Sequence, residues 1–284
     1  MSSSAAAAAA ATPKEDTVSA AKANYKIVAD VGDFNKTQSQ RPKFYHSKPI
    51  EVTQSPNPNW EPMVSNYQLL VSGITPRPIE FLSTVSGSDD DGKFTKNLSP
   101  FSYFQVIDHD PPMFIIGFSS HPERVKNTFH NLKETSEVVI NTISENMIEA
   151  VNATSIDAPY GVSEWEVSGL HEAPTKTVKP SRVQESVFST EGKVVDIKEF
   201  EDHVQPGMSI ASLVLVKATR FWVQEDAVNA ELSHLDLNKS RPLGQLGGIS
   251  YGRVTSTFEQ LRRRWNEEYP KRGIESVGRV ETKD

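Results

Sequence analysis

The feature that most constrains the fold of this chain is a succession of short apolar segments separated by turn residues. The longest of them, Ile210 to Val223, alternates so that one face carries apolar or small side chains. The others are Ile79 to Ser86, Met113 to Ser119, Val138 to Ile143 and Lys193 to Ile197. Strands at this spacing favour an antiparallel barrel or sandwich over alternating βαβ units. The sequence therefore predicts a mainly β fold with peripheral helices.

Three helices are expected around these strands. One lies near residues 121–135 and a second near residues 145–154. The third begins with a capping box at Ser256–Glu259 and continues through Arg262–Arg264, for which a solvated face is the expected role.

The chain divides into four regions by composition. Residues 1–40 are alanine-rich and lack apolar periodicity, so a disordered low-complexity region is expected there. Residues 41–66 carry five prolines, which favours an extended lead-in over a long helix. Residues 67–255 form the predicted compact domain, and residues 256–284 form a C-terminal helix and tail.

Composition excludes several classes of function. The net charge is −7 and no region concentrates Lys and Arg, which argues against nucleic acid as a partner. The absence of cysteine excludes disulfides, thiolate nucleophiles and iron–sulfur clusters. No apolar run reaches the roughly 18 residues of a membrane span, and the N-terminus has neither a signal peptide nor a convincing transit peptide. We therefore expect a soluble, cytoplasmic protein.

Residues 95–104 (Thr-Lys-Asn-Leu-Ser-Pro-Phe-Ser-Tyr-Phe) combine an amide, hydroxyls, a proline and aromatic rings. They follow a strand and the polar turn at Asp89–Gly92. The aromatic faces could flank a flat anionic heteroaromatic ligand, while Asn97 and the serines bond its polar edge. The alternative is a polar hairpin with a few core aromatics.

A second candidate site lies at a helix start. A capping box formed by Ser120 and Glu123 would start the helix early, whereas Asn127 as N-cap would start it at Thr128. The later start would gather Lys126, the Thr128 hydroxyl and unpaired backbone N–H groups into an anion site. The alternative is a plain capped helix with an exposed lysine.

Two further segments stand out. Arg77 lies between Pro76 and Pro78, so a stiffly presented guanidinium could bind a phosphate; an exposed turn arginine is the alternative. The glycine-rich stretch 241–253 lacks the signature of a phosphate loop, and it fits either close packing or a ligand wall.

In chain order, these motifs resemble those of the flavin reductase-like family, the FMN-binding split-barrel flavoproteins. The resemblance covers roughly residues 60–254, and the ordered series is more specific than any single motif. The matching stretches are residues 75–79, 82–86, 97–104, 110–112, 126–131, 138–141, 160–170 and 246–251.

The resemblance implies a split β-barrel that dimerises and holds FMN near the dimer interface. Two departures are visible. Asn127 stands where family members commonly have Asp, which still caps a helix, and Gln245 replaces a frequent arginine, which puts a charge at that site in doubt.

The resemblance also implies a set of cofactor-binding residues. Phosphate or ribityl contacts fall to Arg77, Lys126 and Thr128, and contacts to the ring and ribityl to Asn97, Ser99 and Ser102. Ser83 and Thr84 would lie on the strand beneath the flavin. Tyr251 and Arg253 would form part of the rim, and Pro78 and Leu98 complete the predicted set.

The implied function is an FMN-binding oxidoreductase that transfers hydride or electrons between NAD(P)H and flavin or a small organic substrate, with a monooxygenase as a conceivable partner. No catalytic side chain is required, since flavin N5 accepts the hydride. The seven scattered histidines form no ligand set, so no metal is expected. Segment Ala158–Trp165 is expected over the flavin, with Trp165 otherwise a core aromatic. The alternatives are a flavin-binding or interaction protein with little turnover, and a barrel for another phosphorylated heterocycle such as pyridoxal phosphate.

Overall fold

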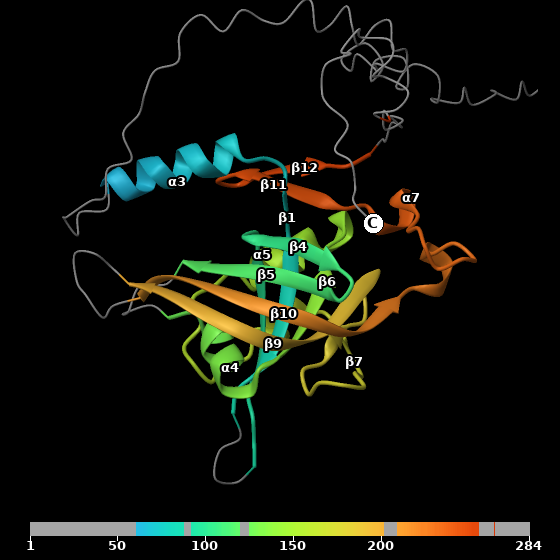
Figure 1. The fold of residues 1–284 in the computed structure, drawn as a ribbon, viewed down its shortest axis with the longest axis horizontal. Helices are drawn as coiled ribbons and strands as arrows, with labels where there is room; N and C mark the ends of the chain where they lie inside the picture. The colour runs from blue at the N-terminus through green and yellow to red at the C-terminus, as the bar shows by residue number, and fades with distance from the viewer. Residues whose placement is uncertain (1–60, 88–91, 120–124, 202–208, 256–263, 265–284) are drawn as a thin grey trace, which may run out of the picture. The chain divides into compact units, whose positions relative to one another are not determined.

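The computed structural model describes residues 61–87, 92–119, 125–201, 209–255 and 264, of which all but the last belong to one compact unit, Ile50–Ser256 (Figure 1). The regions predicted for residues 1–40 and for the C-terminal helix lie outside the described residues, as does the capping box at Ser120. Within the described part of the chain, no helix combines the length and apolarity needed to cross a membrane.

A seven-stranded antiparallel sheet forms the body of the unit. Its strand order is β3-β2-β6-β9-β10-β5-β4. This confirms the predicted mainly β class, and each apolar segment identified in the sequence lies in one of these strands. The strands are β2 (Glu80–Val85), β3 (Lys96–Phe101), β4 (Phe104–His109), β5 (Pro112–Ser119), β6 (Glu137–Thr142), β9 (Phe188–Glu201) and β10 (Ser209–Val223).

Two small sheets complete the β structure. One has the order β1-β11-β12 and joins Arg77–Pro78, Leu243–Gly247 and Ser250–Arg253, in that order. The other pairs β7 (Glu172–Ala173) with β8 (Arg182–Val183). The glycine-rich stretch is thus a hairpin. Gly247 and Gly248 turn it at φ 128° and φ 53°, and Gly244 lies so close to Pro76 that an added Cβ would come within 2.5 Å of the proline Cβ.

The helices lie around the sheets and are mostly short. The one expected near 121–135 begins at Asn127, and the one expected near 145–154 is a 3₁₀ turn followed by α5. The helical elements are α3 (Glu61–Gly73), α4 (Asn127–Thr135), η1 (Glu145–Met147), α5 (Ile148–Ala153), α6 (Trp165–Ser168), η2 (Glu225–Ala227) and α7 (Leu237–Ser240).

Helix α3 corrects one expectation. Residues 61–66 were predicted to be extended because of the prolines around them, yet they form the first half of α3. The reason is the place of Pro62, the second residue of the helix. In the first turn the missing N–H of proline costs no hydrogen bond and its fixed φ suits the helix.

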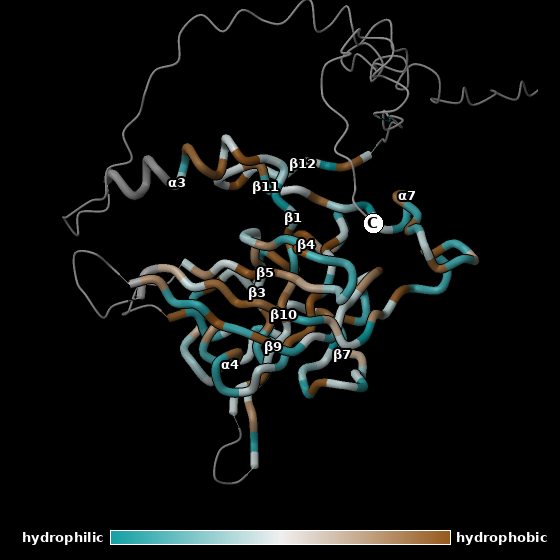
Figure 2. Tube along the Cα trace, in the orientation of Figure 1, coloured by the Kyte–Doolittle hydropathy of each residue, from teal (hydrophilic) through white to brown (hydrophobic). Residues whose placement is uncertain are grey.

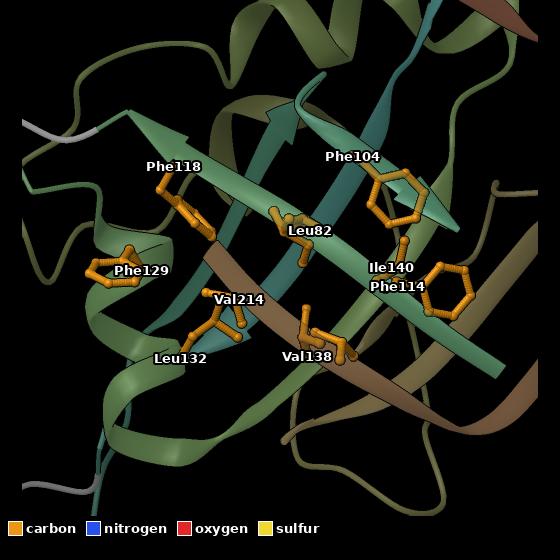
Figure 3. Packing of buried hydrophobic residues seen from close by; sticks show 11 residues of the cluster. Leu82, Phe104, Phe114, Phe118, Phe129, Leu132, Val138, Ile140 and Val214 are labelled. Atoms are coloured by element: carbon orange, nitrogen blue, oxygen red, sulfur yellow. The ribbon is translucent and has the colours of Figure 1, made fainter. Parts of the chain in front are cut away.

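The first hydrophobic core lies between the sheet and helix α4 (Figure 3). The alternation predicted for Ile210–Val223 is seen in its middle, where Ser212, Val214 and Val216 are buried. Phe118 links the strands to the helix, since its ring centroid lies 4.9 Å from that of Phe101 and 5.2 Å from that of Phe129. The remaining members include Leu82, Phe104, Phe114, Ile116, Leu132, Val138 and Ile140.

A second core lies on the other side of strand β2. It joins Phe81 of β2 and Leu98 of β3 to Met147, Val151 and Trp165 of the short helices. Trp165 is therefore a core aromatic. Because Phe81 and Leu82 enter different cores, β2 is buried along its whole length.

Gly192 on β9 tests how tightly the first core packs. It lies opposite Ala218 and Val138, and a Cβ placed on it would overlap Cγ1 of the buried Val216. We expect Gly192→Ala to lower the free energy of unfolding by about 1–3 kcal/mol, measured by urea denaturation. Gly73→Ala is the control, because an added Cβ there meets nothing within 4 Å.

A double-mutant cycle identifies the contact. Val216→Ala removes the atom that the new methyl group would strike, so Gly192→Ala should cost clearly less in the Val216→Ala background. An equal cost in both backgrounds would show that the overlap is relieved elsewhere.

Candidate functional site

A buried polar network joins strands β2 and β3 to the start of helix α4. Thr84 and Asn97 are register partners on neighbouring strands. Asn97 Oδ1 accepts hydrogen bonds from Thr84 Oγ1 at 3.2 Å and from Thr128 Oγ1 at 2.7 Å. Asn131 Nδ2 donates to Thr84 Oγ1 at 3.0 Å. All four side chains are buried, so three of the predicted site residues, Thr84, Asn97 and Thr128, lie in direct contact.

Glu164 anchors this network from the opposite side. Its Oε2 accepts from Asn97 Nδ2 at 2.7 Å and from the Leu98 backbone N–H at 3.3 Å. Burial raises the pKa of the Glu164 carboxyl above its ordinary value, and the hydrogen bonds from Leu98 and Asn97 only partly offset that effect. The Asn97 side chain, which the sequence assigned to a ligand, is thus engaged within the chain through both its oxygen and its nitrogen.

Helix α4 begins at Asn127, close to the later of the two predicted starts, but the prediction of Asn127 as N-cap is wrong by one position. Its N-cap is Lys126 in an extended conformation, without a side-chain cap, and its first turn holds no acidic residue. The Lys126 ammonium lies at the surface, where it pairs with Asp157 Oδ1 at 2.8 Å. The first N–H groups of a helix have no partner within it, and together with the helix dipole they make such an end attractive to an anion.

The segment 157–164 crosses the first two turns of α4. Asn127 Nδ2 donates to the Ala158 carbonyl at 3.0 Å, and the Tyr160 hydroxyl lies 3.3 Å from Asn131 Oδ1 and 3.2 Å from Glu134 Oε2. Glu134 Oε2 also accepts from the Gly87 backbone N–H at 2.7 Å. The segment expected over a flavin therefore lies against α4 and the polar network.

Arg77 has a different environment from the one expected. Its Nη1 donates to the carbonyls of Val71 at 2.5 Å and Ile74 at 2.8 Å, at the end of helix α3, and the side chain is buried. Carbonyl groups at a helix C-terminus have no partner within the helix and attract a cation. In this structure Arg77 therefore stabilises the end of α3, and its contacts give no support to the phosphate role.

The other predicted residues are spread over three places. Ser83 is buried on β2, and Leu98 is buried opposite it on β3. Ser99 and Ser102 are half-buried at and just beyond the end of β3, and Pro78 is half-buried on β1. Tyr251 and Arg253 are exposed on β12, and no contact among the described residues joins them to Lys126 or Thr128.

Sequence reasoning missed Glu164 and Asn131 as members of the network. Both lie within stretches that match the family pattern, but nothing local marks their partners. Glu164 is 67 residues from Asn97, and Asn131 is 47 residues from Thr84. Only the fold brings these pairs together.

Comparison with known proteins identifies the family. The model of the flavin reductase-like domain matches residues 72–241. The chain belongs to the flavin reductase-like family. Two uncharacterised relatives are an Aquifex aeolicus protein, 33% identical over 65% of this chain and 88% of its own length, and a Halalkalibacterium halodurans protein, 30% identical over 71% and 93%. Membership implies flavin binding and supports a flavin-related oxidoreductase activity.

Solved structures show the same fold. Nitrilotriacetate monooxygenase component B of Bacillus cereus superposes with a TM-score of 0.64 at 24% identity, covering 74% of this chain and all of that one. A putative flavin reductase with a split barrel domain from Shewanella frigidimarina gives 0.58 at 19% identity, covering 71% and 93%. The split-barrel prediction is confirmed.

Glu80, on the strand that carries Thr84, offers a pH-dependent test of the fold. Its carboxyl is buried, and Oε2 finds no hydrogen-bond partner among the described residues. Burial raises its pKa from 4.5 to about 8.

The folded chain therefore binds a proton at Glu80 that the unfolded chain releases. The resulting stability is present below about pH 4.5 and is lost as the pH rises through 8. We therefore expect the free energy of unfolding of Glu80→Gln, relative to that of the unmodified protein, to rise between pH 5 and 9 by on the order of 4 kcal/mol at most. Urea denaturation across this range measures the gain, and the exposed Glu149→Gln should show none. Parallel pH profiles for Glu80→Gln and the unmodified protein would contradict an ionisation at Glu80.

Proposed function

We propose that this protein is an FMN-dependent oxidoreductase that transfers hydride or electrons between NAD(P)H and flavin or a small organic substrate. The observation that carries the proposal is the amino end of helix α4. There an exposed lysine and an uncapped first turn lie beside the buried network of Thr84, Asn97 and Thr128.

The phosphate group of FMN fits this helix end. The first turn of α4 carries no acidic side chain, so no acid of the helix itself repels a dianion there. Lys126 reaches the same end, and its partner Asp157 is exposed. An exposed ion pair contributes about 0–1 kcal/mol, so exchanging Asp157 for a phosphate costs little.

The ring would lie against β3 and the residues that follow it. Ser99 and Ser102 are half-buried there, unlike their buried neighbour Leu98, and their hydroxyls can bond the polar edge of a heterocycle. Bound FMN supplies the hydride-accepting centre, and the protein binds, orients and shields it. Arg77 has no place in this proposal, because helix α3 occupies its guanidinium.

A flavin-binding protein with little turnover is the second candidate. The hydrogen bonds of Asn97 to Glu164 and Thr128 favour it, because they engage the Asn97 side chain within the chain, and binding a flavin requires no catalytic group. Anaerobic mixing with NADH or NADPH separates the two functions. Bleaching of the flavin absorbance supports the oxidoreductase, and unchanged absorbance supports the binding protein.

Lys126 provides the test of the cofactor site. We expect Lys126→Ala to weaken FMN binding about tenfold, through loss of a charge-assisted hydrogen bond, and to leave riboflavin binding unchanged because riboflavin has no phosphate. Fluorescence quenching of each flavin measures both constants. Lys133→Ala, in the last turn of the same helix, is the matched control.

Two results would count against the site. One is an equal loss of riboflavin and FMN binding in Lys126→Ala. The other is an unmodified protein that is colourless and binds no added FMN.

We further propose that the protein is a homodimer. Helix α3, strand β4 and the β11–β12 hairpin can be located in Figure 2, and each carries exposed apolar side chains. Leu69 and Leu70 on α3 are 52% and 55% exposed, Ile107 on the edge strand β4 is 48% exposed, and Ile249 at the tip of the β11–β12 hairpin is 95% exposed. Exposed apolar surface of this extent marks an interaction site. Helix α3 packs on β11, β11 pairs with β1, and β1 contacts β4, so the three elements are neighbours.

The self-association can be measured by analytical ultracentrifugation. We expect twice the chain mass of 31.5 kDa for the unmodified protein and a shift to monomer for the double variant Leu70→Glu, Ile107→Glu. Val195→Glu, at an exposed valine on β9, should leave the dimer intact. A dimer that withstands the double variant would show that another surface makes the contact.

A further inference from the structure

A surface pocket lies between helix α7, the turn η1 and the end of strand β12, which we call the arginine pocket. Its charged lining consists of Glu145, Arg241 and Arg253, and its apolar lining includes Leu237, Pro242 and Val254. The cavity has a volume of about 150 Å³. Three elements far apart in sequence therefore bring one acid, two bases and an apolar wall into a single concave site.

The two guanidinium groups share one carboxylate. Arg241 Nη2 donates to Glu145 Oε2 at 2.6 Å, and Arg253 Nε donates to Glu145 Oε1. Hydrogen bonds from Arg253 and Arg241 hold the pKa of the Glu145 carboxyl below its ordinary value, so it stays ionised. Glu145 is half-buried, whereas the side chains of Arg241 and Arg253 are 54% and 67% exposed. The carboxylate thus fixes two guanidinium groups whose outer edges face solvent.

The lining charges do not cancel. Two arginines against one glutamate leave one positive charge in the pocket. Each arginine uses a single nitrogen on Glu145, and among the described residues the remaining guanidinium nitrogens have no acceptor. The described acids between residues 226 and 241 are engaged elsewhere: Asp236 accepts from the Asn238 N–H at the start of α7, Glu231 accepts from Asn229, and Asp226 pairs with Lys239.

We propose that the arginine pocket binds a small organic monocarboxylate. A carboxylate matches the planar fork of a guanidinium, and a single negative charge balances the single excess positive charge. Leu237, Pro242 and Val254 offer an apolar wall for the body of the ligand, in the arrangement typical of small-molecule sites. The volume suits a ligand the size of benzoate.

The pocket is separate from the proposed flavin site. Helices α4 and α7 lie at opposite ends of the unit in Figure 1, with α4 at the lower left and α7 at the upper right. Arg253, which the sequence assigned to the flavin rim, belongs to the arginine pocket in this structure. A carboxylate bound there would leave Lys126 and Thr128 free.

Titration of the full chain with sodium benzoate, followed by calorimetry, tests the proposal. We expect saturable binding with a dissociation constant on the order of 1 mM, as suits a ligand this small. Benzamide, which has the same shape without the charge, should bind far more weakly. Arg253→Gln should weaken benzoate binding at least about tenfold, and Arg220→Gln, at an exposed arginine on β10, should not change it.

A second variant and a second ligand complete the test. Arg241→Gln should weaken benzoate binding as Arg253→Gln does, and a thermal melt of each variant shows that it is folded. FMN binding, measured on the same samples, should be unchanged by benzoate and by either variant. The proposal is overturned by absent saturation, by benzamide binding as tightly as benzoate, by folded arginine variants that keep full affinity, or by competition between benzoate and FMN. If the unmodified protein binds benzoate as expected but does not bind FMN, the flavin proposal is wrong and the proposal for the arginine pocket is unaffected.

Discussion

Burial of strand β2 on both faces is the constraint on which the rest of the unit depends. Phe81 faces one core and Leu82 the other, so a slip of one residue would exchange the two sets of side chains. The register that results sets Thr84 opposite Asn97. Helix α4 is then fixed twice, by Phe129 and Leu132 in the first core and by polar contacts to β2 and β3 on the same side.

The polar network is therefore held together by contacts within the chain. Its amides and hydroxyls are buried and bonded to one another, which avoids the cost of burying polar groups without partners. Lys126 differs, since it is exposed and paired with an exposed acid. A ligand at this end of α4 would need to displace only that weak pair, while the rigid network keeps the helix in position.

Particular elements show how much of the fold and of the candidate site the sequence could predict. Five of the seven strands of the large sheet were predictable because their apolar residues alternate or run together between turns. Strands β3 and β4 were not predicted, because β3 is rich in polar residues and β4 is mostly exposed. Helix α3 was not predicted. Its apolar residues do not gather on one buried side, since Leu69 and Leu70 are exposed, and the prolines before it argued against a helix. The contact of Arg77 with the end of α3 was therefore not predicted either, because its acceptors are carbonyls at the end of that helix. For the candidate site, Asn97 and Thr128 were found from their types and positions, and Thr84 was implied by the family resemblance. Glu164 was not found, because its partners are distant in sequence.

The environments of the cationic side chains show why position in a motif is a poor guide to ligand binding. Arg77 lies in a Pro-Arg-Pro motif that suggested a phosphate contact, yet two main-chain carbonyls accept from its Nη1 and the side chain is buried. Arg241 and Arg253 lie in a stretch whose composition fitted either close packing or a ligand wall, and in the structure they share one carboxylate and stay largely exposed. What a cation can offer a ligand depends on how many acceptors the fold gives it and on whether the charges around it cancel. By that measure the two proposed anion sites, at the start of α4 and in the arginine pocket, are distinct places, although the family resemblance assigned Lys126 and Arg253 to one flavin site.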